Sequence, residues 1–516
     1  MQNYKFNCFY DVVTHNANHK PNKIIIFEED LKITNLQFKK YIDTIANYLS
    51  SIGIKPNDKV ALVMSNSWQF VVNIFAISKI GAIPVPVNNF FKSDELAYVI
   101  NDVQAKLLFS SGKYLAETKD LLIKTNIDQI VWVDDSSIEN EKNINYDKIF
   151  DKNDYVECGA HPSTLDGIAS ILYTSGTTGK PKGAMLTFRN IFSNCEGVMK
   201  VMKAKDGQAC MICYLPMFHA FTLTVTVILP IYTNSGLVVI RSISTKNDFK
   251  KVLKQLLLKR CKYFAGVPEI FNAMSKAKLP WYFHWFHNVR GFICGAAPLS
   301  EEIITRFNKS FKRGKLLEGY GITECSPVVS CNSPEKNKSG SVGQPLSGYA
   351  VKIFDDNMNM LSTGDVGEIC VQGDCVMNGY YNKPEDTTDA IVNGWFKTGD
   401  IGKIDDEGYV FIIDRKKDLI IHKGMNIYPR EIEEVIYTHQ KVNSCAVIGI
   451  TEDSVEFPVA YVELIEHEEL KEAELKEFIK PHLAAFKCPR RIYFVDKLPR
   501  NATGKILKRE LRGKNK

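Results

Sequence analysis

One stretch rich in glycine, serine, threonine and lysine constrains this chain more than any other. It reads Tyr-Thr-Ser-Gly-Thr-Thr-Gly-Lys-Pro-Lys-Gly over residues 173–183 and follows the apolar run 168–172, which predicts a buried strand. A helix is expected from about Asn190. The stretch offers backbone N–H groups, hydroxyls and two ammonium groups, which are the ingredients of a polyphosphate cradle. A flexible surface turn is the alternative, but turns rarely combine so many of these residues.

The stretch is not a Walker A loop. The spacing from Gly176 to Gly179 is too short for that motif, and Pro181 stands after Lys180 where serine or threonine is required. The sequence therefore indicates a different way of holding ATP.

The fold class expected from the pattern is α/β. Before the stretch, β-like runs alternate with amphipathic segments, and Thr34 is placed to cap the first long helix. The expected strands are 23–27, 59–64, 83–87 and 129–133, with helices over 36–52 and 67–80 and a loop or spacer over 134–152. This order predicts layered parallel sheets with crossover helices.

The C-terminal third predicts two further units. From about Val351, short β segments and tight turns indicate a small β subdomain. Beyond the Asp414–Asp418 region, strands and two helices (429–438 and 471–483) indicate a small α+β unit of its own. We expect one domain over 1–415 and a second, mobile domain over 416–516.

Composition excludes several classes of protein. The net charge of +6 on 516 residues does not demand nucleic acid, and no nucleic-acid partner is expected. Thirteen scattered cysteines predict a reducing compartment rather than a disulfide framework. The pair Cys210 and Cys213 lies in an apolar run and reads as core cysteines rather than a zinc or redox site. With no signal peptide or membrane span, we expect a soluble, cytoplasmic protein.

A second element carries an acid that suits a metal. Gly319-Tyr-Gly-Ile-Thr-Glu324 ends in a carboxylate, and Mg²⁺ prefers one or two carboxylates together with phosphate oxygens. Standing alone, Glu324 reads as an ordinary surface acid. Beside a phosphate cradle, it becomes a candidate metal ligand.

Five motifs together resemble the adenylate-forming superfamily of AMP-forming acyl-CoA synthetases, luciferases and peptide-synthetase adenylation domains. They are the stretch 173–183, Gly295–Leu299, Gly319–Glu324, Gly394–Asp400 with Asp414-Arg415, and Pro499–Lys505. They occur in the family's order over nearly the whole chain. The full sequence looks most like bacterial medium- or long-chain fatty acid–CoA ligases.

The resemblance implies ATP, Mg²⁺ and CoA as cofactors and gives each motif a role. For ATP, it places Thr174, Ser175, Gly176, Thr177, Thr178, Gly179 and Lys182 at the phosphates, Thr323 at the α-phosphate, Glu324 at Mg²⁺, Tyr320 and Gly321 at adenine, and Asp400 and Arg415 at the ribose. Gly295, Ala296 and Ala297 would lie beside adenine and the acyl group, and Lys505 between the attacking carboxylate and the α-phosphate. Lys417 would be the hinge, and Gly424 and Asn426 would contact the pantetheine arm.

The implied reaction has two steps. A carboxylate attacks the α-phosphorus of ATP and pyrophosphate leaves, after which the CoA thiol attacks the acyl-adenylate and displaces AMP. Lys505 would serve the first step electrostatically, and rotation of the C-terminal domain would then replace it with the 423–426 segment. Alternatives are a ligase that loads an acyl-carrier protein, a CoA ligase for an aryl or short-chain acid, and a non-catalytic paralogue, which would lack Lys505 or Glu324.

Two features have competing interpretations. His219 borders the expected acyl site, where it either gates the substrate or packs in the core. The aromatic stretch 279–290 is flanked by lysines and Arg290, and either packs beneath an acyl tunnel or makes a weak peripheral contact with the inner membrane face. Its His284 and His287 are too isolated to indicate a metal site. A homodimer is also left open.

Overall fold

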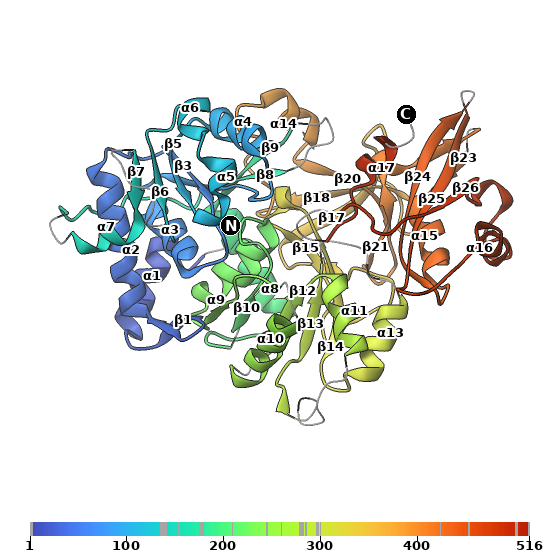
Figure 1. Ribbon diagram of the computed structural model, residues 1–516, viewed down its shortest axis with the longest axis horizontal. Coiled ribbons are helices and arrows are strands. Elements are labelled where there is room, and N and C mark those ends of the chain that lie inside the picture. Colours follow the sequence, from blue (N-terminus) through green and yellow to red (C-terminus); the bar gives the residue numbers. More distant parts are fainter. Residues whose placement is uncertain are drawn as a thin grey trace.

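The protein is a mixed α/β chain with a large N-terminal domain and a smaller C-terminal domain, as expected (Figure 1). The computed structural model describes residues 4–134, 142–152, 155–174, 180–208, 210–243, 246–259, 261–277, 283, 286–295, 299, 301–423, 425–452, 455–500 and 504–513. Figure 1 shows the C-terminal domain, in orange and red, at one end of the molecule.

The first layer is a parallel sheet buried on both faces. Its strand order is β4-β3-β5-β6-β7. Successive side chains of β3 enter different cores, because Val60 and Leu62 belong to one apolar cluster and Ala61 and Val63 to another. The strands are β3 (Lys59–Val63), β4 (Ile83–Pro86), β5 (Ala105–Ser110), β6 (Gln129–Trp132) and β7 (Asn143–Asn145).

Helices cover this sheet and the neighbouring layers. Thr34 caps α2 as expected: its Oγ1 accepts from the Gln37 N–H at 3.2 Å, and Gln37 Oε1 accepts from the Thr34 N–H at 2.9 Å. The helices are α1 (Phe9–His19), α2 (Asn35–Ser51), α3 (Trp68–Lys79), α4 (Ser93–Val103), α5 (Leu115–Thr118), α6 (Leu121–Lys124), α7 (Tyr146–Asp151), α8 (Phe188–Val201), α9 (Leu229–Tyr232) and α10 (Lys246–Leu258).

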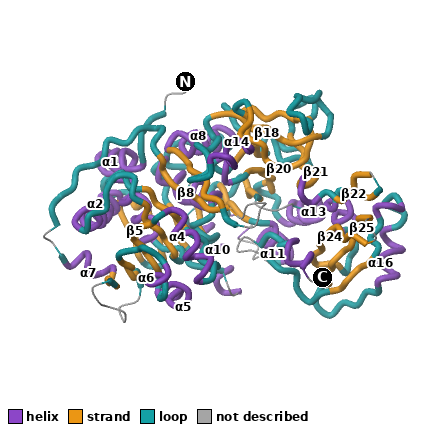
Figure 2. Tube along the Cα trace, turned by 90° about the horizontal axis from the view of Figure 1, so that it is seen from above, coloured by secondary structure: helices purple, strands orange, loops and turns teal. Residues whose placement is uncertain are grey.

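Two further sheets complete the large domain's layers. One has the order β10-β11-β1-β2 and the other β12-β13-β14-β15-β16. Their strands are β1 (Ile24–Glu28), β2 (Leu31–Thr34), β10 (Met211–Cys213), β11 (Leu237–Val239), β12 (Tyr263–Gly266), β13 (Gly291–Cys294), β14 (Lys315–Gly321), β15 (Val328–Cys331) and β16 (Gln344–Pro345). Helices α11 (Pro268–Lys276) and α13 (Glu301–Ser310) lie on the side that faces the C-terminal domain in both views (Figures 1 and 2).

The expected β subdomain is present. Its strands are β17 (Tyr349–Phe354), β18 (Gly367–Gly373), β19 (Ile391–Val392), β20 (Trp395–Ile404) and β21 (Val410–Arg415), with α14 (Pro384–Ala390) beside them. Asp400 and Arg415 stand opposite each other in the β20–β21 pair. The two residues are therefore neighbours because of strand register.

The C-terminal domain has its own core. Two apolar clusters there draw only on residues from Ile420 onward. The elements are β22 (Ile420–His422), β23 (Met425–Ile427), α15 (Pro429–Tyr437), β24 (Val442–Glu452), β25 (Val455–Leu464), α16 (Glu472–Ile479), β26 (Arg491–Phe494) and α17 (Lys508–Gly513). A short 3₁₀ turn, Lys416–Asp418, connects this domain to β21.

Two local expectations were wrong. The segment expected to be a loop at 134–152 contains β7 and α7, because Tyr146 and Ile149 are buried in the main core. The helix expected over 471–483 ends at Ile479. The helix expected from about Asn190 is present as α8, and before it β8 (Ile168–Thr174) pairs antiparallel with β9 (Lys182–Thr187).

Candidate active site

A β-hairpin carries the two described ends of the predicted phosphate loop. Thr174 ends β8, Lys182 begins β9, and the two are paired in register. Ser175, Gly176, Thr177, Thr178 and Gly179 lie outside the described residues. The hairpin thus anchors both ends of the loop at one place in the large domain.

The Glu324 carboxylate lies beside this loop. Its Oε1 accepts hydrogen bonds from Thr174 Oγ1 at 3.2 Å and from the Tyr380 hydroxyl at 3.0 Å. Thr323 precedes it at the start of a short 3₁₀ turn. A carboxylate and a hydroxyl next to a phosphate loop form a donor set that suits a hard cation such as Mg²⁺.

A neighbouring segment holds Lys182 as well as Glu324. The Lys182 ammonium forms an ion pair with Asp386 and lies 5.4 Å from the centroid of the Tyr380 ring. The Tyr381 N–H donates to the Gly183 carbonyl, and the Met377 N–H donates to the Glu324 carbonyl. Sequence reasoning missed Tyr380 and Asp386, because their partners are distant in the chain and no motif that we identified contains them.

Tyr320, Asp400 and Arg415 meet on the other side of the site. The Tyr320 hydroxyl donates to Asp400 Oδ2 at 2.6 Å, and Arg415 Nε lies 3.2 Å from Asp400 Oδ1. Burial, and secondarily the Asp400 charge, raise the pKa of Tyr320 well above its usual value. Gly321 packs so tightly that an added Cβ would lie 1.7 Å from the Pro327 carbonyl oxygen. The arrangement offers a buried carboxylate with a fixed orientation.

Lys505 reaches the same region from the C-terminal domain. Burial lowers the pKa of its ammonium to about 7, helped by the charge of Arg415 and opposed by that of Asp400. The charge of Lys505 also acts on His219, whose pKa falls to about 4, mainly through burial. The imidazole of His219 is therefore neutral near pH 7.

Asn66 fixes the loop that contains His219. Its side-chain amide donates to the Leu215 carbonyl at 2.9 Å, and its Oδ1 accepts from the Met217 N–H at 2.9 Å. The loop ends in a π-helical turn, Thr222–Ile228, of a kind often found at functional sites. Gly295 lies nearby, since an added Cβ would meet the Phe221 ring at 3.9 Å. Ala296 and Ala297 lie outside the described residues.

Of the two residues predicted to contact the pantetheine arm, the structure describes Asn426. Asn426 lies in β23, at the outer edge of the C-terminal domain and away from α11 (Figure 1). Gly424 lies outside the described residues. In this arrangement Lys505, and not Asn426, accompanies Asp400 and Arg415.

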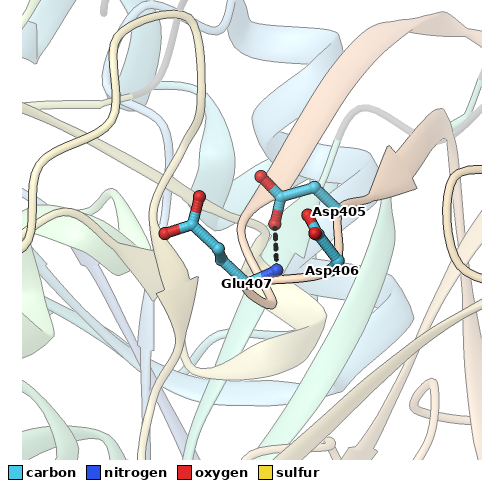
Figure 3. Close-up of side chains that lie close together, drawn as sticks. All are labelled: Asp405, Asp406 and Glu407. Atoms are coloured by element: carbon cyan, nitrogen blue, oxygen red, sulfur yellow. Dashed lines mark hydrogen bonds between the residues drawn. The ribbon is translucent and has the colours of Figure 1, made fainter.

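An acidic turn elsewhere already has partners for two of its three carboxylates, those of Asp405 and Glu407. Asp405, Asp406 and Glu407 lie close together in the turn after β20 (Figure 3). Asp405 Oδ1 accepts from the N–H groups of Glu407 at 3.1 Å and Tyr409 at 2.8 Å, and Lys338 pairs with both Asp405 and Glu407. These bonds give the cluster a structural role in the turn.

Three further features of the sequence were the cysteines near Cys210, the aromatic stretch 279–290 and the question of a membrane span. The sulfur atoms of Cys210 and Cys261, which precede β10 and β12, lie 3.7 Å apart. In the aromatic stretch, Phe283 and His287 pack in the core, whereas Phe286 is 69% exposed. Residues 279–282, 284 and 285 lie outside the described part of the chain. Among the described helices, none has the length and apolar character that crossing a membrane requires.

Comparisons with known proteins identify the family of the chain. The chain matches the family described as AMP-binding enzyme over residues 13–381 and the AMP-binding enzyme C-terminal domain over 431–505. It is 33% identical over 496 residues to a long-chain-fatty-acid–CoA ligase of Escherichia coli O157:H7, covering 90% of this chain and 87% of that protein.

Two further relatives are named for acids other than a long-chain fatty acid. A 4-coumarate–CoA ligase of Petroselinum crispum is 33% identical over 489 residues, covering 91% of this chain and 87% of its own. The o-succinylbenzoate coenzyme A synthetase of Bacillus subtilis, solved with ATP and magnesium ion, superimposes with a TM-score of 0.85 at 26% identity. That match covers 97% of this chain and 98% of the other.

Proposed function

The chain belongs to the AMP-binding enzyme family and is an AMP-forming acyl-CoA ligase, and we propose that it activates a medium- or long-chain fatty acid. Its cofactors are ATP, Mg²⁺ and CoA, and its organic substrate is a small-molecule acid. The observation that supports the adenylation step is that Lys505 of the C-terminal domain interacts electrostatically with Asp400, Arg415 and His219 of the large domain.

The chemistry follows from charge and position. In the first step a carboxylate oxygen bonds to the α-phosphorus of ATP while the bond to pyrophosphate breaks, leaving an acyl-adenylate. Both reacting groups are anions, so a cation placed between them lowers the barrier without a protein nucleophile. In the second step the CoA sulfur bonds to the acyl carbonyl carbon, and AMP leaves.

We propose the following roles from the family resemblance, and the positions of the described residues support them. The 174–182 loop would hold the phosphates, Glu324 would bind Mg²⁺ and Thr323 would contact the α-phosphate; bound Mg²⁺ would neutralise phosphate charge. Asp400 and Arg415 take the ribose, and Tyr320 with Gly321 and the 295–297 segment bounds adenine. Lys505 holds the carboxylate and the α-phosphate together. His219, neutral and fixed by its loop, borders the acyl group and excludes water from it.

Thioester formation requires a different domain orientation. We propose that residues 416–516 rotate as a unit about Lys417, in the 3₁₀ turn that joins the two cores. That rotation would withdraw Lys505 and bring Gly424 and Asn426 over the adenylate. The outward position of β23 supports this account.

The proposal of a fatty acid rests on apolar surroundings. Met217, Ala220, Phe221 and Leu223 around His219 are all buried apolar residues, and named relatives act on long-chain acids. An aryl acid is the second candidate, because 4-coumarate ligases match equally well. A carrier-protein loading ligase is the third.

An acid panel tests this assignment. AMP release is measured with ATP and Mg²⁺ over acids from acetate to oleate, with 4-coumarate and benzoate included, each with and without CoA. We expect CoA-dependent turnover with a maximum at a medium or long chain. A maximum at an aryl acid would overturn the fatty-acid assignment, and adenylation that CoA cannot drive onward would favour a carrier protein.

The lowered pKa of Lys505 predicts a pH dependence. As the pH rises through about 7, the free enzyme loses the ammonium that adenylation needs, so kcat/KM for acid-dependent pyrophosphate exchange should fall. Bound phosphates and carboxylate favour the charged form, so kcat should fall only at higher pH. In Lys505→Arg the guanidinium stays protonated, so kcat/KM should not fall as the pH rises through about 7. The same fall of kcat/KM in that variant would contradict the assignment.

We propose a cytoplasmic location with a weak peripheral membrane contact. The thirteen cysteines are free thiols, which suits a reducing compartment. Exposed Phe286, Lys276 and Arg290 could sit at an anionic headgroup boundary. Equal sedimentation of wild type and Phe286→Ser with anionic vesicles would contradict the proposed membrane contact.

A homodimer stays a prediction that light scattering can measure.

A further inference from the structure

We infer that Glu269 is a positioning residue that clasps the Lys505-bearing turn and holds the C-terminal domain in its adenylate-forming orientation. The inference rests on the proposed function and adds a residue that no identified motif contains. Glu269 belongs to the large domain, where it is the second residue of α11 at the end of a parallel strand. Lys505 belongs to the C-terminal domain.

The turn that carries Lys505 is organised by Arg500. Its Nη1 donates to the Gly504 carbonyl at 3.0 Å, and its Nη2 donates to Ser444 Oγ at 2.7 Å. A bridge between Arg500 and Ile506, together with a 2.8 Å bond from the Leu507 N–H to the Pro499 carbonyl, closes the turn. All of these partners lie in the C-terminal domain, so they can persist when it rotates.

Glu269 adds a contact that crosses between the domains. Its Oε1 lies 2.9 Å from Nη1 of Arg500, so one guanidinium nitrogen binds both the turn and the large domain. The contact is specific to this orientation, because α11 stays behind when the C-terminal domain rotates. It therefore favours the state in which Lys505 lies at the site.

Gly504 makes the close approach possible. A Cβ at this position would lie 2.8 Å from the Glu269 carboxyl carbon, and the residue has a φ of +81°, which favours glycine. The carboxylate therefore touches the turn at the residue directly before Lys505. Movement of Glu269 would be transmitted to Lys505 through a single peptide unit.

The expected effect is a shift between orientations. The pair is partly exposed, with 43% of the Glu269 side chain and 28% of the Arg500 side chain accessible. Exposed ion pairs change an equilibrium by up to about fivefold. A clasp of that strength biases the domain orientation and still releases for the second step.

The test uses Glu269→Gln and Glu269→Lys, with Glu302→Gln as the matched control. Glu302 pairs with Arg306 at 2.9 Å within α13, so its loss removes an exposed ion pair that does not cross between domains. We expect adenylation, measured as acid-dependent pyrophosphate exchange, to fall roughly three- to fivefold in Glu269→Gln and further in Glu269→Lys. Thioester formation from supplied acyl-adenylate should stay at the wild-type rate or rise.

A second readout measures orientation without turnover. Exposed Ile123 and His467 are each replaced by a noncanonical amino acid that carries a spin label. Double electron–electron resonance then measures the distance between the two domains. Glu269→Gln should lower the population of the Lys505-bound orientation, and Glu302→Gln should not. Unchanged populations in Glu269→Gln would overturn the clasp. A population shift in a protein that shows no adenylation with any acid would support the clasp and refute the proposed function.

Discussion

Lys505→Ala is expected to lower the rate of adenylate formation by about 10²- to 10³-fold, the loss typical when one preorganised electrostatic group is removed from a reacting centre. The effect is large because the first step joins two anions. Lys505 is the residue that the C-terminal domain places beside Asp400 and Arg415 in this structure.

The same substitution should leave the second step nearly intact. When acyl-adenylate and CoA are supplied directly, Lys505 is not needed between a carboxylate and a phosphate. We therefore expect thioester formation within a small factor of the wild-type rate. Pyrophosphate exchange measures the first half-reaction, and acyl-CoA formation from synthetic acyl-adenylate measures the second.

Lys505→Arg is the matched control because it keeps the charge and changes its shape. It should retain more adenylation than Lys505→Ala, although the guanidinium is larger than the ammonium it replaces. Equal loss of both half-reactions in Lys505→Ala, with unchanged thermal stability, would contradict the role assigned to this residue.

Lys417→Pro should have the opposite pattern and spare adenylation. Lys417 lies in a 3₁₀ turn, and proline fixes φ near −65°, within the range that such turns adopt. We therefore expect the orientation seen here to tolerate the substitution. Rotation that needs a different φ at this position is blocked.

Thioester formation should then fall by roughly 10- to 100-fold, which corresponds to the about 1–3 kcal/mol that a strained backbone costs. Lys417→Ala is the control, since it removes the side chain and leaves φ free to change. Parallel loss of both half-reactions in Lys417→Pro would argue against a hinge at this residue.

Elements of the fold could be predicted from the sequence where a few adjacent residues specify them. The strand before the phosphate loop, the Thr34 cap and the α15 helix are each specified by a few adjacent residues. Helix α7 was missed because its six residues lie in a polar stretch. Its burial depends on Tyr146 reaching Asn73, 73 residues away, with a hydroxyl bond of 3.0 Å.

In the candidate site, too, short motifs could be predicted from the sequence, whereas contacts between distant residues could not. The motifs that contain Glu324, Asp400 and Lys505 could be found because each is a compact string of residues. The partners that orient them could not, since Tyr380 lies 56 residues from Glu324 and Glu269 lies 231 residues from Arg500. Such pairs are created by sheet order and domain contact, which no short window of sequence contains.

This enzyme makes an acyl-adenylate and passes the acyl group to CoA. The most direct measurement mixes the purified enzyme with α-labelled ATP, Mg²⁺ and the best acid of the panel, and then quenches and separates the products. Without CoA, we predict labelled acyl-adenylate and free pyrophosphate; after CoA is added, we predict acyl-CoA and labelled AMP. Labelled ADP, or an adenylate that CoA leaves unchanged, would contradict the account.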